Sequence, residues 1–380
     1  MALLGMHMAN ELLSLPVAGV TLALAAAAVG VAARRLRRGL DAERLPLMGV
    51  MGAFVFAAQM VNFTLPGLPG TSGHLGGGVL LGVLLGPAAG IVTMSSVLIV
   101  QCLLFQDGGL LALGCNILNM GVVPCLVGWG VFRLVTLRGE PRPWRLYLAT
   151  WAACILAVVL GAALVPVEAG LSGVLLVAPA DFLGLMVSVH LVVGFLEGLI
   201  TFAVLTYLRR TRSALLVGAT AVAVCRRAAD GPLPAAPAHC AGGRVVAASF
   251  VVTAVLLAGV ISWFASPQPD GLEWALGRLG QAQRVLPEPK PAVTAVGQLQ
   301  DRVTPMKDYT VRRASPADTP HDSAATPGSE AAGGPGSAAS TWPNIDGWGS
   351  LAGLAGTAVV LGVLYGLSRL LRRRRRVAAD

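Results

Sequence analysis

The feature that most constrains this chain is its series of apolar runs, because many are long enough to cross a lipid bilayer as a helix, which takes about 20 residues. Hydrophobic residues fill 55% of its 380 positions and charged residues only 12%, and the mean hydropathy is +0.72. The sequence therefore predicts an all-α polytopic membrane protein of the cell membrane, and it shows no soluble enzyme domain.

We expect a bundle of seven spans followed by a module of two. The third and fourth spans are short, and the sequence Leu85-Gly86-Pro87 separates them. A kink or a turn would suit this break. The nine expected spans cover roughly residues 14–33, 47–65, 75–88, 90–106, 113–135, 146–167, 180–208, 245–264 and 350–371.

Clusters of arginine predict the orientation of the chain. Four clusters occur, within residues 34–38, 133–145, 209–227 and 372–376. Cytoplasmic loops of membrane proteins are enriched in Lys and Arg, and all four clusters fall on that side only if residues 75–106 cross the membrane twice. We therefore interpret the Gly-Pro break as a turn, and expect an extracytoplasmic N-terminus and a cytoplasmic C-terminus.

Composition divides the chain into an N-terminal region of closely spaced spans and a C-terminal part with two spans and a long loop. Residues 1–208 hold closely spaced spans, and residues 209–244 are expected to be a cytoplasmic linker. Residues 245–371 contain two spans joined by a loop rich in Pro, Ala, Gly, Ser and Thr, and such a composition predicts disorder over residues 275–345. A basic cytoplasmic tail, residues 372–380, ends the chain.

Two histidines stand out as candidate metal ligands. His7 lies near the N-terminus and His74 lies in a glycine-rich bend, and the expected topology brings both to the outer face. If Met6 began the mature chain, its amine, the His7 amide and ring nitrogens and His74 would supply four nitrogens, a set that suits Ni(II) or Cu(II) and, less specifically, Co(II). Because Met1 to Gly5 precede Met6, an upstream start assignment, clipping of the leader and a different site all stay open.

Other polar residues have simpler explanations. Asp270 and Glu273 stand at the outer surface, where they assist loading of an ion, contact the N-terminal region from the outer side, or only cap a helix or hold the turn. His190 and Glu197 lie seven residues apart on one helical face, so we expect them to pair in a structural polar network rather than a second metal site.

Several motifs resemble the cobalt/nickel-specific substrate-capture components of energy-coupling factor transporters. They span roughly residues 6–208, and the segment Pro269-Asp270-Gly271-Leu272-Glu273 resembles the signature of the small two-span accessory subunit of the same transporters, here fused behind the first part. The motifs are Met6-His7, Gly70 to Gly77, Leu84 to Pro87, Val100 to Leu110, Ala112 to Met120 and His190 to Thr201.

The resemblance implies a function and a site. It implies that Met6, His7 and His74 bind the transported Ni(II) or Co(II), with no prosthetic group, although the sequence Met8-Ala9-Asn10-Glu11 departs from the family's acidic continuation. It also implies a transmembrane coupling protein and cytoplasmic ATPase subunits as partners. The chain contains no Gly-x-x-x-x-Gly-Lys phosphate loop, so ATP hydrolysis is expected from those partners. Membrane lipid is a further expected partner, and nucleic acid is not.

Two rival functions stay open. An ATP-independent secondary transporter or channel for a divalent cation would more often carry ionisable residues deep in several spans, and here Asp181, His190 and Glu197 are the main examples. A membrane metalloenzyme would need a general base beside an open metal site, and the sequence has no His-Glu-x-x-His pattern.

Overall fold

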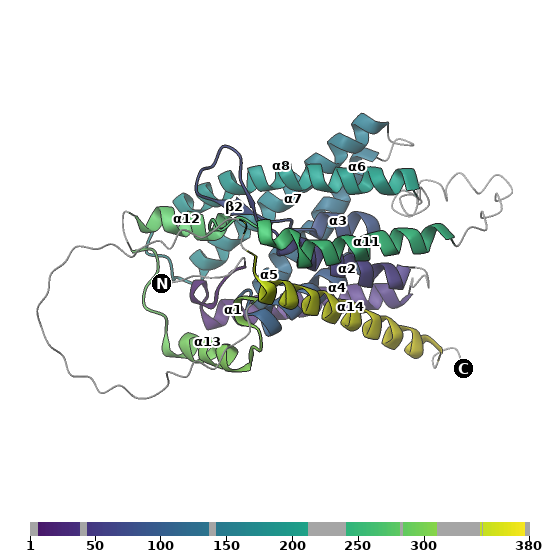
Figure 1. Cartoon of the computed structure of the whole chain (residues 1–380). Helices are drawn as coiled ribbons and strands as arrows, with labels where there is room; N and C mark the ends of the chain where they lie inside the picture. Colours follow the sequence, from purple (N-terminus) through teal and green to yellow (C-terminus); the bar gives the residue numbers. More distant parts are fainter. Residues whose placement is uncertain are drawn as a thin grey trace, which may run out of the picture.

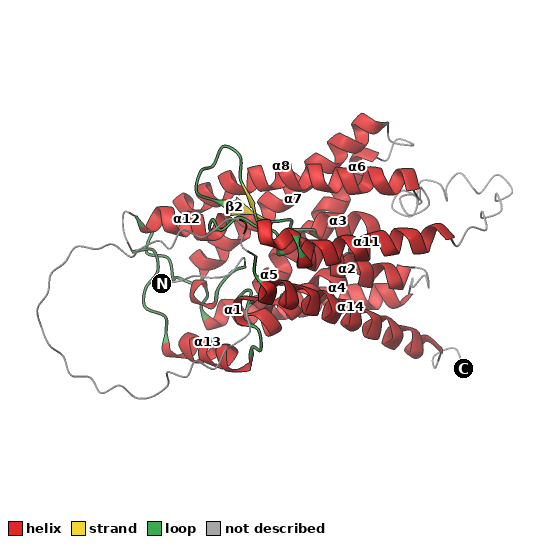
Figure 2. Ribbon diagram, viewed as in Figure 1, coloured by secondary structure: helices red, strands yellow, loops and turns green. Residues whose placement is uncertain are grey.

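The computed structural model describes residues 7–38, 44–136, 142–211, 241–281, 284–309, 343 and 345–376. Within these residues the chain is helical apart from loops and a short antiparallel pair, β1 (Phe63–Thr64) with β2 (Ser72–Gly73) (Figure 2). Six helices are long and apolar enough to cross a membrane, and two more are apolar but shorter. The expected all-α polytopic fold is therefore confirmed.

The N-terminal bundle comprises residues 7–211. Two long antiparallel neighbours, α7 and α8, pack along each other, and α1 packs on α4 and α5. Three π-helical turns lie between α4 and α6, and a 3-10 turn, η1 (Asn10–Leu12), precedes α1. In chain order after η1, the helical elements of the bundle are α1 (Leu15–Arg38), α2 (Arg44–Gln59), α3 (Gly78–Leu85), α4 (Pro87–Val100), η2 (Gln101–Phe105), α5 (Leu113–Asn116), η3 (Ile117–Val122), η4 (Pro124–Gly128), α6 (Trp129–Thr136), α7 (Pro143–Leu171) and α8 (Pro179–Thr211).

The expected third span is the main departure from prediction. Only the eight residues of α3 are helical there, and at 1.5 Å per residue they reach about 12 Å, less than half the thickness of a bilayer core. The residues before α3 form an extended loop because a buried carboxylate holds their backbone amides, as described below. The prediction of a full span over residues 75–88 is therefore wrong.

The expected turn at Gly86 is present. Gly86 has a φ of +82°, a conformation that glycine adopts without strain, and Pro87 follows as the first residue of α4. Gly82 and Gly90, equally far from the turn, allow α3 and α4 to approach closely, since a Cβ on Gly90 would lie 3.0 Å from the Gly82 backbone nitrogen. The two helices form a tight hairpin.

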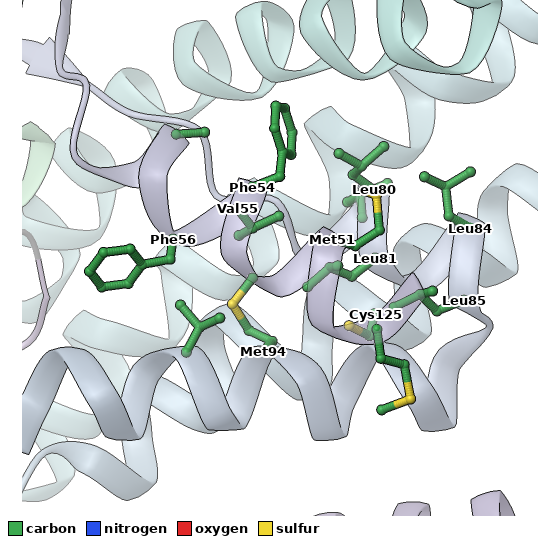
Figure 3. Close-up of a cluster of buried hydrophobic side chains, with 14 of the residues drawn as sticks. Met51, Phe54, Val55, Phe56, Leu80, Leu81, Leu84, Leu85, Met94 and Cys125 are labelled. Carbon is green, nitrogen blue, oxygen red and sulfur yellow. The ribbon is translucent and has the colours of Figure 1, made fainter. Parts of the chain in front are cut away.

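Helix α3 lies at the centre of the largest apolar cluster (Figure 3). All of its residues are buried, between α2, α4 and the π-helical turn η4. Lipid is as apolar as leucine, so close packing rather than exclusion from water holds this cluster together in a membrane. The labelled side chains are Met51, Phe54, Val55, Phe56, Leu80, Leu81, Leu84, Leu85, Met94 and Cys125.

The C-terminal module, residues 241–376 where described, packs against the N-terminal bundle. Its two long helices, α11 (Ala241–Gly259) and α14 (Gly347–Arg376), both contact α2 and each other. Helix α12 (Gly271–Gly280) packs on α8, and together with α13 (Pro291–Val303) it lies at the end of the bundle opposite the C-terminal end of α14 (Figure 1). Two 3-10 turns, η6 (Ile261–Phe264) and η7 (Lys307–Tyr309), complete the module.

Disorder was expected over residues 275–345, and this is wrong for residues 275–280 at the end of α12, for residues 291–303, which form α13, and for residues 307–309, which form η7. The reason is that these polar residues do not need a core of their own. Gln300 of α13, only 1% exposed, instead hydrogen-bonds to the N-terminal bundle. Residues 310–342 lie outside the described residues, as do most of the linker 209–244 and the last four residues of the chain.

Candidate metal centre

The N-terminal segment that carries His7 is threaded into the bundle. The Met8 amide donates to Asn116 Oδ1 at 3.0 Å, and the Gly109 amide donates to the Met8 carbonyl at 3.0 Å. His7 is only 3% exposed, and its Nδ1 lies 2.6 Å from Asp107 Oδ1. The segment is thereby fixed at His7 and Met8, whereas Met6 lies outside the described residues.

The loop that carries His74 is held by a buried carboxylate of α8. Glu197 accepts hydrogen bonds from the Gly76 amide at 2.9 Å and the Gly77 amide at 3.1 Å. From the other side, Gln59 Nε2 donates to the Gly76 carbonyl at 2.8 Å. The peptide groups after His74 thus have partners without forming a helix, which explains why α3 begins only at Gly78.

The two predicted histidines converge. The ring centroids of His7 and His74 are 6.1 Å apart and the ring planes are tilted by 44°. Both rings line a cavity of about 110 Å³, enclosed by the His74 loop, η3, η4, α7, α8 and the start of α12. His7 Nε2 is buried there without a hydrogen-bond partner among the described residues, and a metal ion is one way to satisfy such an atom.

Asp107 connects His7 to the C-terminal module. Its Oδ1 faces His7, and its Oδ2 accepts a hydrogen bond from the Tyr309 hydroxyl at 2.7 Å. Burial opposes ionisation of both partners, but their attraction is stronger: it raises the pKa of His7 and lowers the pKa of Asp107. These two shifts favour an ion pair between a protonated His7 and an ionised Asp107.

The predicted pairing of His190 with Glu197 is wrong. His190 Nδ1 donates to the Met186 carbonyl at 2.8 Å, one turn back on α8, and Glu197 binds the His74 loop. Both side chains nevertheless line the same cavity as His7 and His74. Two backbone amides of the glycine-rich loop donate to the Glu197 carboxylate in place of the expected imidazole.

The segment around Asp270 docks on the His74 loop. The Ser72 amide donates to the Pro269 carbonyl at 2.8 Å and the Ser72 hydroxyl donates to the Gln268 carbonyl at 2.7 Å. Asp270 Oδ1 accepts from the Glu273 amide at 2.8 Å, which is the expected cap of a helix, α12. Burial, with help from nearby carboxylates, raises the pKa of Asp270 to about 7.

Sequence reasoning missed the roles of three residues that hold the site: it did not single out Asp107 or Asn116, and it gave Glu197 a different partner. A signal for Asp107 is present in the glycines that follow it. Gly108 has a φ of +93°, and a Cβ there would lie 2.9 Å from the His7 Cβ. A Gly-Gly pair after a carboxylate thus indicates close approach of another segment, although the sequence does not identify that segment.

Among the described residues, no three His, Cys, Asp or Glu side chains are grouped as metal ligands. The predicted site differs from such a group, because two of its four nitrogens belong to the backbone and Met6 is not described. The fold and the cavity nonetheless define a polytopic membrane protein in which two histidines meet between the N-terminal bundle and the C-terminal module.

Comparison with known proteins identifies the family. Residues 7–215 match the model of the cobalt uptake substrate-specific transmembrane region, and residues 244–373 match that of the PDGLE domain. Because the first match covers more than half of the chain, the protein belongs to the family of cobalt uptake substrate-specific membrane components, with a PDGLE domain fused behind it. The resemblance inferred from the sequence motifs is confirmed.

Relatives support the same assignment. The chain is 39% identical over 211 residues to a protein of Haloquadratum walsbyi named for metal transport, which covers 56% of this chain and 93% of the relative. It is 37% identical over 207 residues to a protein of Archaeoglobus fulgidus named as a putative fused nickel transport protein, and the match covers 54% of this chain and 66% of the relative. It is 32% identical over 234 residues to a protein of Rhodobacter capsulatus named as a fused nickel transport protein, and that match covers 58% of this chain and 67% of the relative. These relatives are named as metal transport proteins, and the chain is a membrane component of the same family.

Proposed function

We propose that this chain captures Ni(II) or Co(II) at the outer face of the cell membrane, as the substrate-binding subunit of an ATP-driven energy-coupling factor transporter. The observation that carries the proposal is the convergence of His7 and His74 on one small cavity, at 6.1 Å between ring centroids. The four ligands would be the amine of Met6, the amide and ring nitrogens of His7, and the ring of His74. Four nitrogens in a plane select by geometry rather than by charge.

The His7 ring has to turn before it chelates an ion in this way. A six-membered chelate ring with the His7 amide uses Nδ1, which lies against Asp107 in this structure. Turning about the Cβ–Cγ bond would bring Nδ1 toward the cavity and leave Nε2 as the nitrogen that can bond a carboxylate. Such an outer carboxylate orients an imidazole ligand and makes it a stronger base.

The proposed subunit depends on partners for energy. The chain contains no phosphate-binding loop, so a separate transmembrane coupling protein and a pair of cytoplasmic ATPase subunits would drive release of the ion into the cell. We assign residues 1–208 to metal capture, 209–244 to a linker, 245–371 to the accessory domain and 372–380 to a cytoplasmic tail. The ends of α8 and α14, both basic, lie opposite α12 and α13, which supports an extracytoplasmic N-terminus (Figure 1).

The first test is intact-mass measurement and N-terminal sequencing of the purified chain, followed by nickel and cobalt titration of the same sample and of a His74→Ala variant. A mature chain that begins at Met6, binds one ion tightly and loses it in the variant would support the proposed ligands. Binding by a chain that begins at Met1 would refute the amine ligand and leave His74 in place. Binding that is unaffected by His74→Ala would refute the site.

A second test addresses the energy source. Vesicles that contain the chain alone, or the chain with its coupling and ATPase partners, are compared for nickel uptake with and without ATP. We expect uptake only in the complete, ATP-supplied system. Uptake by the chain alone would instead favour a secondary transporter or channel.

A further inference from the structure

Two buried glutamines link the two segments that carry the candidate metal ligands. Gln59 is the last residue of α2 and Gln101 is the first residue of η2, and both are 0% exposed. Gln101 Nε2 donates to Gln59 Oε1 at 3.0 Å. Burying a pair of amides inside an apolar bundle is costly, and apolar side chains of similar size would fill the same space at lower cost. The pair therefore calls for a reason other than packing.

One end of the glutamine pair holds the His74 loop. Gln59 Nε2 donates to the Gly76 carbonyl at 2.8 Å. Because a carbonyl oxygen only accepts, the nitrogen of Gln59 faces the loop and its oxygen faces Gln101. Glu197 anchors the same loop to α8, whereas Gln59 links it to Gln101.

The other end of the pair holds the partner of His7. The Gln101 carbonyl accepts from the Asp107 amide at 3.1 Å, across a turn in which Gln106 has a φ of +58°. The Asp107 side chain in turn places its Oδ1 2.6 Å from His7 Nδ1. A line of hydrogen bonds, which passes through the side chain and then the backbone of Gln101, thus runs from the His74 loop to His7.

The hydrogen-bonding capacity of the glutamine pair is not fully used. Gln101 Oε1 is buried without a hydrogen-bond partner among the described residues. A buried polar network that is only partly satisfied stabilises a fold less than apolar side chains of the same shape. Stability therefore does not explain the pair, whereas the need to fix two segments relative to each other does.

We propose that Gln59 and Gln101 are positioning residues of the metal site, which fix the His74 loop relative to the turn that carries Asp107 and so hold the two histidine rings at the spacing that an ion requires. This inference rests on the proposed metal site. Neither glutamine lines the cavity of His7 and His74, so each acts through a neighbour. Ligands held in position lose less conformational entropy on binding, and this raises the affinity for the ion.

The test compares Gln59→Leu, Gln101→Leu and the double variant in the full-length chain in detergent. Gln59→Leu leaves the Gln101 amide buried without its partner, and adding Gln101→Leu removes that amide, so the double variant should melt at a higher temperature than Gln59→Leu. The matched control is Thr93→Val, which removes an equally buried hydroxyl of α4 that has no hydrogen-bond partner among the described residues. Calorimetric titration measures Ni(II) affinity, and thermal melting measures stability.

We expect all three glutamine variants to bind Ni(II) about ten-fold more weakly than the wild type, as is typical when residues that orient metal ligands are lost. The loss in the double variant should be no larger than in either single variant, because the two glutamines act as a unit. Thr93→Val should bind Ni(II) as the wild type does. Affinity that recovers in the double variant together with stability would overturn the proposal, since a purely structural pair behaves in that way.

Hydrogen exchange in the metal-free chain tests the same link without the ion. Exchange of the backbone amides of residues 75–77 should accelerate about ten-fold in Gln101→Leu, although Gln101 bonds Gln59 rather than the loop. Exchange at the wild-type rate would overturn the proposal whether or not the chain binds metal. Wild-type Ni(II) binding that His74→Ala abolishes shows separately that the metal site itself stands.

Discussion

Replacing Gln300 by alanine should release α13 from the N-terminal bundle. Gln300 is the buried polar residue through which this helix docks, and its amide uses both its oxygen and its nitrogen. The partly exposed Asp301 adds one contact, because it accepts from Gln106 Nε2 at 2.8 Å. Nε2 donates to the carbonyls of Gly108 at 2.9 Å and Cys102 at 3.2 Å. Oε1 accepts from the Leu110 amide at 2.9 Å and from Asn10 Nδ2 at 3.2 Å.

The size of the effect follows from these four contacts. A typical hydrogen bond contributes about 1 kcal/mol net, and buried partners left without a bond add to the loss, so the variant should lose about 3–4 kcal/mol of docking free energy. Since 1.4 kcal/mol corresponds to a factor of ten, the population of undocked α13 should rise at least about 100-fold. The small buried side chain of Val293 and the single hydrogen bond from Gln106 to Asp301 are the contacts that remain in the variant.

Hydrogen exchange of backbone amides in residues 293–303 measures this population directly, because amides of a docked helix exchange through its opening. The matched control is Gln298→Ala, which makes the same substitution at an exposed position of the same helix. Exchange should accelerate about 100-fold or more in Gln300→Ala and change little in the control. Equal exchange in the two variants would refute the view that the Gln300 contacts hold α13 in place.

Three further outcomes test the residues around the site. Glu197→Gln leaves one loop amide without an acceptor, at a cost of about 1–3 kcal/mol, so calorimetric titration should show nickel binding weakened about ten-fold; an unchanged affinity would contradict a positioning role. Tyr309→Phe keeps the stack on Phe105 but removes the bond to Asp107, and amide exchange in residues 305–309 should rise about ten-fold, whereas a wild-type rate would show that the bond is not needed. Nickel affinity should fall as pH decreases through the pKa of His7, which Asp107 raises above 6.5, so Asp107→Asn should shift the midpoint of the titration to lower pH; a midpoint that stays or rises would refute the ionic pair.

The sequence predicted the spans well where length alone decides the outcome. Apolar runs such as residues 146–167 and 180–208 have only one way to bury their backbone in lipid, and they form α7 and α8. The prediction of the third span was wrong although its composition is equally apolar. The backbone amides before α3 bond a side chain instead of forming a helix. Glu197 lies more than 100 residues away, and no local pattern reveals that it takes the amides of Gly76 and Gly77.

Helix α13 shows the opposite error. The sequence between Pro291 and Val303 is polar, and its composition alone predicts disorder. It is ordered because Gln300 finds backbone groups on the N-terminal bundle. Contacts between distant segments, rather than local propensity, decide both cases.

The same reasoning separates the predicted part of the site from the missed part. His7 and His74 are recognisable because an isolated histidine next to apolar spans calls for a partner. Asp107 and Glu197 are missed because each acts through a neighbour, one on the His7 ring and the other on the His74 loop. Candidate ligands can be identified from the sequence, whereas the residues that orient them are identified only from the fold.

The contacts of the C-terminal module make the candidate site a joint product of both parts of the chain. Tyr309 bonds Asp107, and Asp107 bonds His7; Gln300 bonds the backbone of the loop that follows Asp107. Linkage between two equilibria is reciprocal. If docking of the module increases the affinity of His7 for an ion, then binding of the ion stabilises the docked module by the same free energy. Metal binding at His7 should therefore slow amide exchange in α13, some 290 residues along the chain, by the factor by which Gln300→Ala weakens the metal affinity.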